Sequence, residues 1–230
     1  MSHTAIPPTR CPDHTVILSC SAMTLHVVAA QQKMGTNYSV VELDSELHMK
    51  PKEMRQRIIE TLEEIPDRVD TVLVAMGFCG GSWESIPSKK RVVIPKVDDC
   101  ITLLLHTDDT WHPNLKECGH LYLRDSIDGK FSPMSIKERL EKEYGDEGKY
   151  IFRSWFASYT NADIIDTGVY DCHSEEYILA AMENADLMEA TLDYVPGSNL
   201  ILEKLVSGRW DQQFLIIEPG TSVTNMDFLM

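Results

Sequence analysis

Three cysteines in the first half of the chain each follow a hydrophobic run that is typical of a buried β-strand. The runs are Val16 to Ser19 before Cys20, Val72 to Phe78 before Cys79, and Val92 to Asp99 before Cys100. In an open parallel sheet the carboxyl ends of the strands share one edge, where such folds bind their ligands. Because thiolates bind zinc and iron well, three thiols at one edge predict a metal site.

A histidine adds a fourth candidate ligand. Residues 38–43 read as another strand, and His48 follows it. Cysteine and histidine in a three-to-one ratio are a recognised zinc ligand set, and thiolates also hold iron and iron–sulfur clusters. The predicted metal ligands are therefore Cys20, His48, Cys79 and Cys100. They come from separate strands and form no CxxC pair, so the prediction rests on topology.

These four residues also have a simpler interpretation. A free cysteine often fills a core as a small apolar residue, which would make the three thiols structural. His48 would then be a helix-entry residue, because Pro51 is typical of the first turn of a helix, expected here through residue 64. Asp98 or Asp99 would cap the helix that follows, although Cys100 in a first helical turn would also have a lowered pKa.

Gly77, Gly80 and Gly81 flank Cys79. Glycines after a strand allow a tight turn and close approach by a ligand, so these three are the predicted cofactor-binding residues. The segment contains neither GxGxxG nor the Lys-Ser/Thr of a phosphate loop, which argues against nucleotide binding. Cys172 is a possible further ligand or acid–base residue at the same edge, its alternative being a capped helix start. No GxSxG elbow is present, and no catalytic residue is identified.

Composition excludes several classes of function. The 230 residues carry a formal net charge of −15, which argues against binding to nucleic acid or to an anionic membrane surface. No apolar run of about 18 residues exists, and the first residues do not resemble a secretory signal. A cytoplasmic location is expected. In that compartment the six cysteines are better read as reduced thiols or metal ligands than as disulfides.

The order of elements predicts an α/β fold, with a doubly wound, mostly parallel sheet in a single domain spanning residues 1–230. Residues 14–107 form its first half and carry the Cys/His edge, with helices at 22–33, 51–64 and 98–106. Residues 107–150 read as an insertion or lid, since glycines and prolines are scattered among charges. The second half, 151–220, has strands at 162–167 and 214–217 and helices at 174–193 and 199–206; 221–230 is a tail. Two lobes split near the insertion are the alternative.

Several of these stretches together resemble a family of bacterial and archaeal proteins filed as domain of unknown function sixteen thirty-eight. The matching stretches are Ser19-Cys20, Leu47-His48 with Pro51, Gly77-Phe78-Cys79-Gly80, Val93 to Cys100, Thr160 with Asp166-Thr167-Gly168, and Gly208-Arg209-Trp210 with Pro219-Gly220. The resemblance implies a role near corrinoid-dependent methyltransferases in one-carbon metabolism, with a corrinoid protein or a methyltransferase as partner. The family pattern often has His where this chain has Asp98, which would change the charge of the site.

The protein is expected to bind zinc or iron at the cysteine-rich edge and to act in methyl-group metabolism. Three thiolates around a divalent ion leave a negative site, which suits activation of a thiol better than activation of water. If the protein is an enzyme, methyl or thiol-group transfer is the expected reaction. One alternative is a non-catalytic accessory protein that holds a cofactor, a small molecule or a methyltransferase. The other is a metal-free enzyme with Cys79 or Cys100 as nucleophile and His48 as base.

Overall fold

The computed structural model describes residues 12–229, and the chain divides into two compact units. The first unit comprises Met1–Leu115 and Asn199–Met230, and the second comprises Lys116–Ser198. Each contains a parallel sheet with helices, so the α/β class predicted from the sequence is confirmed. The single domain expected for residues 1–230 thus consists of two units, whose boundaries differ from the insertion expected at 107–150.

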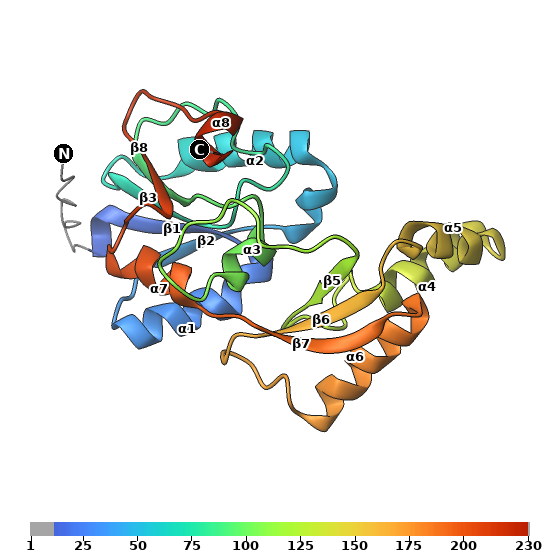
Figure 1. The fold of residues 1–230 in the computed structure, drawn as a ribbon. Coiled ribbons are helices and arrows are strands. Elements are labelled where there is room, and N and C mark those ends of the chain that lie inside the picture. Colours follow the sequence, from blue (N-terminus) through green and yellow to red (C-terminus); the bar gives the residue numbers. More distant parts are fainter. Residues whose placement is uncertain (1–11, 230) are drawn as a thin grey trace. The chain divides into compact units, whose positions relative to one another are not determined.

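The first unit is built on a five-stranded sheet with the order β2-β1-β3-β4-β8 (Figure 1). Its strands are β1 (Thr15–Cys20), β2 (Ser39–Leu43), β3 (Thr71–Ala75), β4 (Arg91–Pro95) and β8 (Phe214–Ile217). Strands β2, β1, β3 and β4 are parallel, whereas β8 pairs antiparallel with β4. Every residue of β1 and β3 is buried, as expected for central strands covered on both faces.

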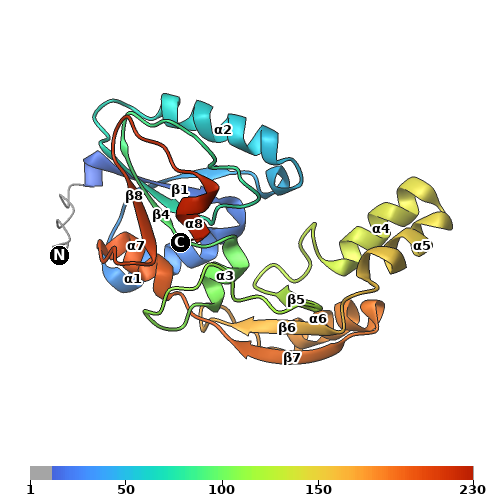
Figure 2. The same ribbon diagram turned by 45° about the horizontal axis from the view of Figure 1, so that its top comes forward.

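Helices cover both faces of this sheet, which confirms the doubly wound arrangement. Helices α1 (Thr24–Met34) and α7 (Leu200–Ser207) lie on one face and α2 (Pro51–Glu64) on the other (Figures 1 and 2). Helix α2 has the bounds that the sequence predicted, and Pro51 stands at its start, where its missing N–H costs nothing. Short elements complete the unit: α3 (Cys100–Leu105), α8 (Asn225–Leu229) and three 3-10 helices (Pro12–His14, Ser21–Met23 and Ser45–Met49).

The second unit has its own three-stranded parallel sheet with the order β5-β6-β7. The strands are β5 (His120–Leu123), β6 (Asn161–Asp166) and β7 (Thr191–Pro196), and the helices are α4 (Pro133–Tyr144), α5 (Glu147–Phe156) and α6 (Glu175–Met188). One core cluster, which includes Leu123, Phe152, Ile164 and Ala181, holds these elements together.

Two expectations for this region are corrected. The strand predicted at 162–167 does not continue the first sheet, because β6 pairs with β5 and β7. The helix predicted to reach residue 193 ends at Met188, since Glu189 adopts a left-handed conformation with a φ of 58°. The next residues, Thr191 to Pro196, include β-branched and aromatic side chains and form β7.

At the other end of the chain, α7 stops at Gly208, which has a φ of 78°, as the sequence indicated. The strand predicted at 214–217 is present as β8, but it is antiparallel. In the part of the chain from 12 to 229, no helix is both long enough and apolar enough to span a membrane.

A histidine–carboxylate pair in the second unit gives a pH-dependent contribution to stability. His120 Nδ1 lies 2.6 Å from Asp163 Oδ2, and hydrogen bonding to Asp163 raises the pKa of the imidazole. A raised folded-state pKa stabilises the protein fully below the unfolded pKa of about 6.5, and this contribution is lost as the pH rises through the folded value. We expect urea denaturation at several pH values to show this loss in the native chain and to show a smaller loss in His120→Gln.

Candidate metal centre

The structure places all four predicted ligands at the carboxyl edge of four adjacent parallel strands. Cys20 is the last residue of β1, His48 lies in the 3-10 helix after β2, Cys79 lies in the turn after β3, and Cys100 begins α3 after β4. In the order β2-β1-β3-β4 the direction of winding reverses between β1 and β3. Ligands of open α/β sheets bind at such a reversal, and the four side chains flank it from both sides.

Three of these residues bring their donor atoms together, and the fourth contacts one of them. Cys20 Sγ lies 3.2 Å from His48 Nε2, and the donor atoms of His48, Cys79 and Cys100 are all within 4.8 Å of one another. Bond lengths of about 2.3 Å for sulfur and about 2.0 Å for nitrogen separate neighbouring ligands of a tetrahedral zinc ion by about 3.5–3.8 Å. The donor atoms of His48, Cys79 and Cys100 are therefore close to the spacing that one ion requires, and Cys20, which is outside this 4.8 Å group, adjoins it through His48.

The three thiols are buried, and they interact with one another. Hydrogen bonds from Cys20 and Cys79 lower the pKa of Cys100. The pKa of Cys79 is raised, first by its hydrogen bond to Cys100 and then by burial. The thiols therefore titrate as a coupled group. A cation bound here would stabilise the negative charge of additional thiolates, so its binding would release protons from the thiols.

A left-handed turn presents Cys79 to the cluster. Cys79, Gly80 and Gly81 have φ values of 47°, 67° and 87°, and this conformation is unfavourable for a residue with a Cβ. The backbone N–H of Cys79 donates a hydrogen bond to the carbonyl of Asp98 at 2.7 Å, which joins the turn after β3 to the turn after β4. Cys79 is therefore held in a costly conformation beside Cys100, as residues at functional sites often are.

Gly77 permits the close approach of these two turns. A Cβ built on Gly77 would lie 2.6 Å from the Cα of Asp99, which leaves no space for a side chain. Asp99 in turn caps α3, because its Oδ1 accepts hydrogen bonds from the N–H groups of Ile101 and Thr102, each at 3.0 Å. The predicted cap is thus confirmed. Cofactor binding by Gly77, Gly80 and Gly81 stays a prediction.

His48 is positioned by contacts between the segments after β1 and β2. The N–H of Ser45 donates to Ser21 Oγ at 3.0 Å, and Asp44 Oδ1 accepts from the N–H of Glu46 at 2.9 Å. These bonds fix the 3-10 helix that carries His48 next to the end of β1. The position of His48 shortly after a predicted strand identified it as a candidate ligand. The hydrogen bond between Ser45 and Ser21 could not be predicted from that local pattern.

The model of a protein family matches residues 42–206, and the family is described as a protein of unknown function, DUF1638. The chain belongs to the DUF1638 family. The matched region contains His48, Cys79 and Cys100, whereas Cys20 precedes it. No curated protein and no solved structure matches the chain.

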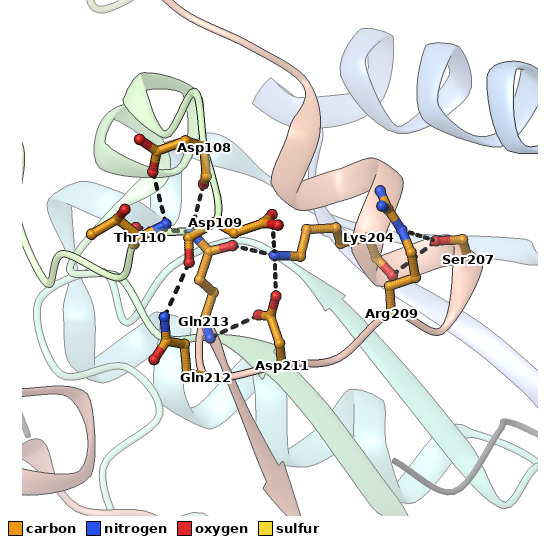
Figure 3. Close-up of polar contacts among 9 residues, drawn as sticks. All are labelled: Asp108, Asp109, Thr110, Lys204, Ser207, Arg209, Asp211, Gln212 and Gln213. Atoms are coloured by element: carbon orange, nitrogen blue, oxygen red, sulfur yellow. Dashed lines mark hydrogen bonds and ion pairs between the residues drawn. The ribbon is translucent and has the colours of Figure 1, made fainter. Parts of the chain in front are cut away.

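The sequence did not indicate the polar network that supports the β4 side of the DUF1638 site. Lys204 is 1% exposed, and its Nζ contacts Asp109, Asp211 and Gln213 (Figure 3). Gln213 also donates hydrogen bonds to the carbonyls of Asp108 and Thr110. The network therefore joins α7 and the start of β8 to the segment that follows α3.

That segment returns to the turn that carries Cys100. The carbonyl of Pro113 accepts a hydrogen bond from the N–H of Asp98 at 3.0 Å, and the indole of Trp111 donates to the carbonyl of Lys96 at 2.7 Å. These hydrogen bonds thus connect the segment held by the Lys204 network to the turn before Cys100. Buried cations of this kind have no local signal in a sequence, because their partners are distant along the chain.

Replacement of Lys204 by Met is expected to destabilise the first unit of the DUF1638 chain by about 1–3 kcal/mol, the usual cost of an unsatisfied buried polar group. Met preserves most of the apolar stem but leaves the fully buried Gln213 without its Nζ contact. Urea denaturation monitored by circular dichroism measures the change. Lys50→Met is the control, because Lys50 and its partner Glu53 are both more than half exposed; an equal loss in both variants would contradict the assignment.

The conformation of Cys79 also has a measurable consequence. In metal-free DUF1638 protein, Cys79→Gly is expected to be more stable than Cys79→Ala by about 1 kcal/mol, because glycine adopts a positive φ without the Cβ penalty. Chemical denaturation in the presence of a chelator compares the two variants. A lower stability of Cys79→Gly would show that the turn is not strained.

The remaining candidate residues lie elsewhere. Cys172 belongs to the second unit and lies at the carboxyl edge of the other sheet, which corrects its assignment to the same edge as Cys20. Burial and the neighbouring Asp166 raise the pKa of Cys172 to about 11. Cys118 is exposed in the second unit, and Cys11 lies outside the described residues.

Proposed function

We propose that this protein binds one zinc or iron ion through Cys20, Cys79 and Cys100, with His48 completing or flanking the ligand set. The observation that carries the proposal is the convergence of these four donors from four separate strand ends, with Cys20 Sγ and His48 Nε2 only 3.2 Å apart. A structural role for the thiols alone would not require the left-handed conformation of Cys79.

The donor set also favours a class of chemistry. Three thiolates and a neutral imidazole give a divalent ion a net charge of −1 at the site, so a bound ion would be a weak Lewis acid. Such an ion keeps a thiol deprotonated at neutral pH more readily than it activates water. Iron, alone or in an iron–sulfur cluster, fits the same thiolates.

We assign the protein to methyl or thiol-group transfer in one-carbon metabolism, linked to corrinoid methyltransferase systems. In such a step a thiolate attacks the methyl carbon of a donor, a sulfur–carbon bond forms, and the bond to the leaving group breaks with its electron pair on that group. The protein would supply the orientation of the thiolate and a partly water-excluded site. His48, which is less buried than the cysteines, would be the ligand that a substrate thiol displaces.

The first test is elemental analysis with an absorption spectrum on anaerobically purified full-length protein. Near-stoichiometric zinc or iron supports the proposal. Bound metal is then tested for function by adding a small thiol and a methyl donor, with the alkylated thiol measured by mass spectrometry. Metal without turnover would favour an accessory role beside a methyltransferase.

A metal-free cysteine enzyme is the second candidate, and the lowered pKa of Cys100 favours it. In this candidate Cys79 or Cys100 is the nucleophile and His48 is the base. The protein should then contain no metal, and iodoacetamide should modify one of these two thiols before the other buried thiols. If all three thiols were equally protected from iodoacetamide, and a chelator removed this protection, the result would instead support the metal centre.

A further inference from the structure

A second cluster of ligand-type side chains lies in the second unit, and the function proposed above does not use it. It consists of Asp166, Cys172 and His173, whose donor atoms all lie within 4.8 Å of one another. His173 Nε2 is 3.1 Å from Asp166 Oδ2, and the Cys172 thiol is within hydrogen-bonding reach of the Asp166 carboxylate. We propose that these three residues form a separate, open binding site for a zinc-like divalent ion.

The position of the cluster follows the same topological rule as the first. Asp166 is the last residue of β6, the central strand of the β5-β6-β7 sheet, and Cys172 and His173 lie in the connection between β6 and α6. The carboxyl ends of parallel strands are where α/β sheets bind ligands. Each unit therefore carries its own group of metal-ligand side chains at such an edge.

The side chains of Asp166 and His173 have orienting contacts outside the cluster, and a further contact holds the backbone of Cys172. The N–H of Gly168 donates to Asp166 Oδ1 at 3.1 Å, so the other oxygen of this carboxylate faces His173. The imidazole of His173 stacks on Tyr194 with ring centroids 4.9 Å apart. The hydroxyl of Tyr194 donates to the carbonyl of Cys172 at 3.0 Å. Supporting contacts of this kind hold metal ligands in place before the ion arrives.

The types of donor select the ion. One thiolate, one imidazole and one carboxylate suit zinc and cobalt, whereas magnesium and calcium require oxygen ligands and iron–sulfur clusters require more cysteines. With neutral imidazole, the two negative ligands balance a divalent ion, so this site would be neutral where the first is negative. A surface ion pair between His173 and Asp166 alone would not account for the stacking of His173 on Tyr194.

The burial of the ligands indicates an open coordination position. Cys172 is 1% exposed, while the side chains of His173 and Asp166 are 63% and 40% exposed. An ion bound here would have protein on one side and water on the other, which is typical of sites with three protein ligands and a water. A neutral site with bound water is the better Lewis acid of the two, and it suits polarisation of a carbonyl or phosphoryl group.

The test is equilibrium dialysis of the full-length chain against zinc, followed by metal analysis of native protein, Cys172→Ala and His173→Gln. Each variant should bind one zinc ion fewer per chain than native protein. Cys118→Ala is the control, because Cys118 is an exposed thiol of the same unit, and it should bind as the native chain does. Unchanged zinc content in Cys172→Ala and His173→Gln would overturn the proposal. His173 is exposed, so its variant stays informative even if Cys172→Ala is poorly folded.

A cobalt titration separates this site from the first one. In Cys79→Ala/Cys100→Ala protein, cobalt should still give a thiolate-to-cobalt absorption band, and the further change Cys172→Ala should remove it. A band that persists without Cys172, or no band at all in the double variant with a native circular dichroism spectrum, would exclude the second site. Because native protein would keep this band even if the first cluster bound nothing, failure of one proposal is distinguishable from failure of the other.

Discussion

Removal of one thiol, in Cys79→Ala, is expected to abolish metal binding at the first unit and the stabilisation that metal provides. At a free metal concentration roughly 1,000 times the Kd, an ion that binds only the folded state stabilises by about 4 kcal/mol. Thermal unfolding with and without added zinc should show this difference in the first unit of native protein and not in the first unit of the variant. Cys20→Ala and Cys100→Ala should behave in the same way, because all three thiols lie in one cluster.

Two controls define this result. Cys118→Ala removes an exposed thiol of the other unit and should leave metal stabilisation unchanged. His48→Ala distinguishes a ligand from a flanking residue: loss of the ion makes His48 the fourth ligand, whereas retention leaves that position to a substrate. Retention of stoichiometric metal at the first unit in Cys79→Ala would refute the proposed centre.

Addition of a single methyl group, in Gly77→Ala, is expected to destabilise the first unit and weaken metal binding together. The new Cβ would lie 2.6–2.8 Å from three backbone atoms of Asp99, so the turn after β3 must move away from the turn after β4. Overpacking of this kind typically costs about 1–3 kcal/mol. The same movement would separate Cys79 from Cys100. Urea denaturation of metal-free protein and zinc competition with a chelator measure the two effects.

Gly148→Ala is the matched control, since its Cβ would lie 2.4 Å from the carbonyl oxygen of Leu140 within the second unit. It should lower stability by a similar amount while the affinity of the first centre for zinc stays the same. If both variants lost zinc equally, general destabilisation would explain the result, and Gly77 would have no specific role in positioning Cys79.

The sequence alone determined the α/β class and the meeting of the four predicted ligands. Buried runs such as residues 71–75 predict parallel strands, and a residue at the end of a strand or a few positions beyond it lies near the edge where that strand ends. These relations are local, so Cys20, His48, Cys79 and Cys100 could be named from their positions alone. The bounds of α2 were predictable for the same reason, because Pro51 marks its first turn.

Tertiary structure decided the rest, because strand pairing and buried polar contacts join residues that are far apart in the chain. No local pattern shows that β6 pairs with β5 and β7 rather than with the first sheet, and this pairing gives Cys172 a site of its own. The fit of Gly77 against Asp99 also depends on two turns that meet only after folding. Lys204 finds Asp109 and Gln213 in the same way, through packing of α7 and β8, and the sequence pattern carries no information on that contact.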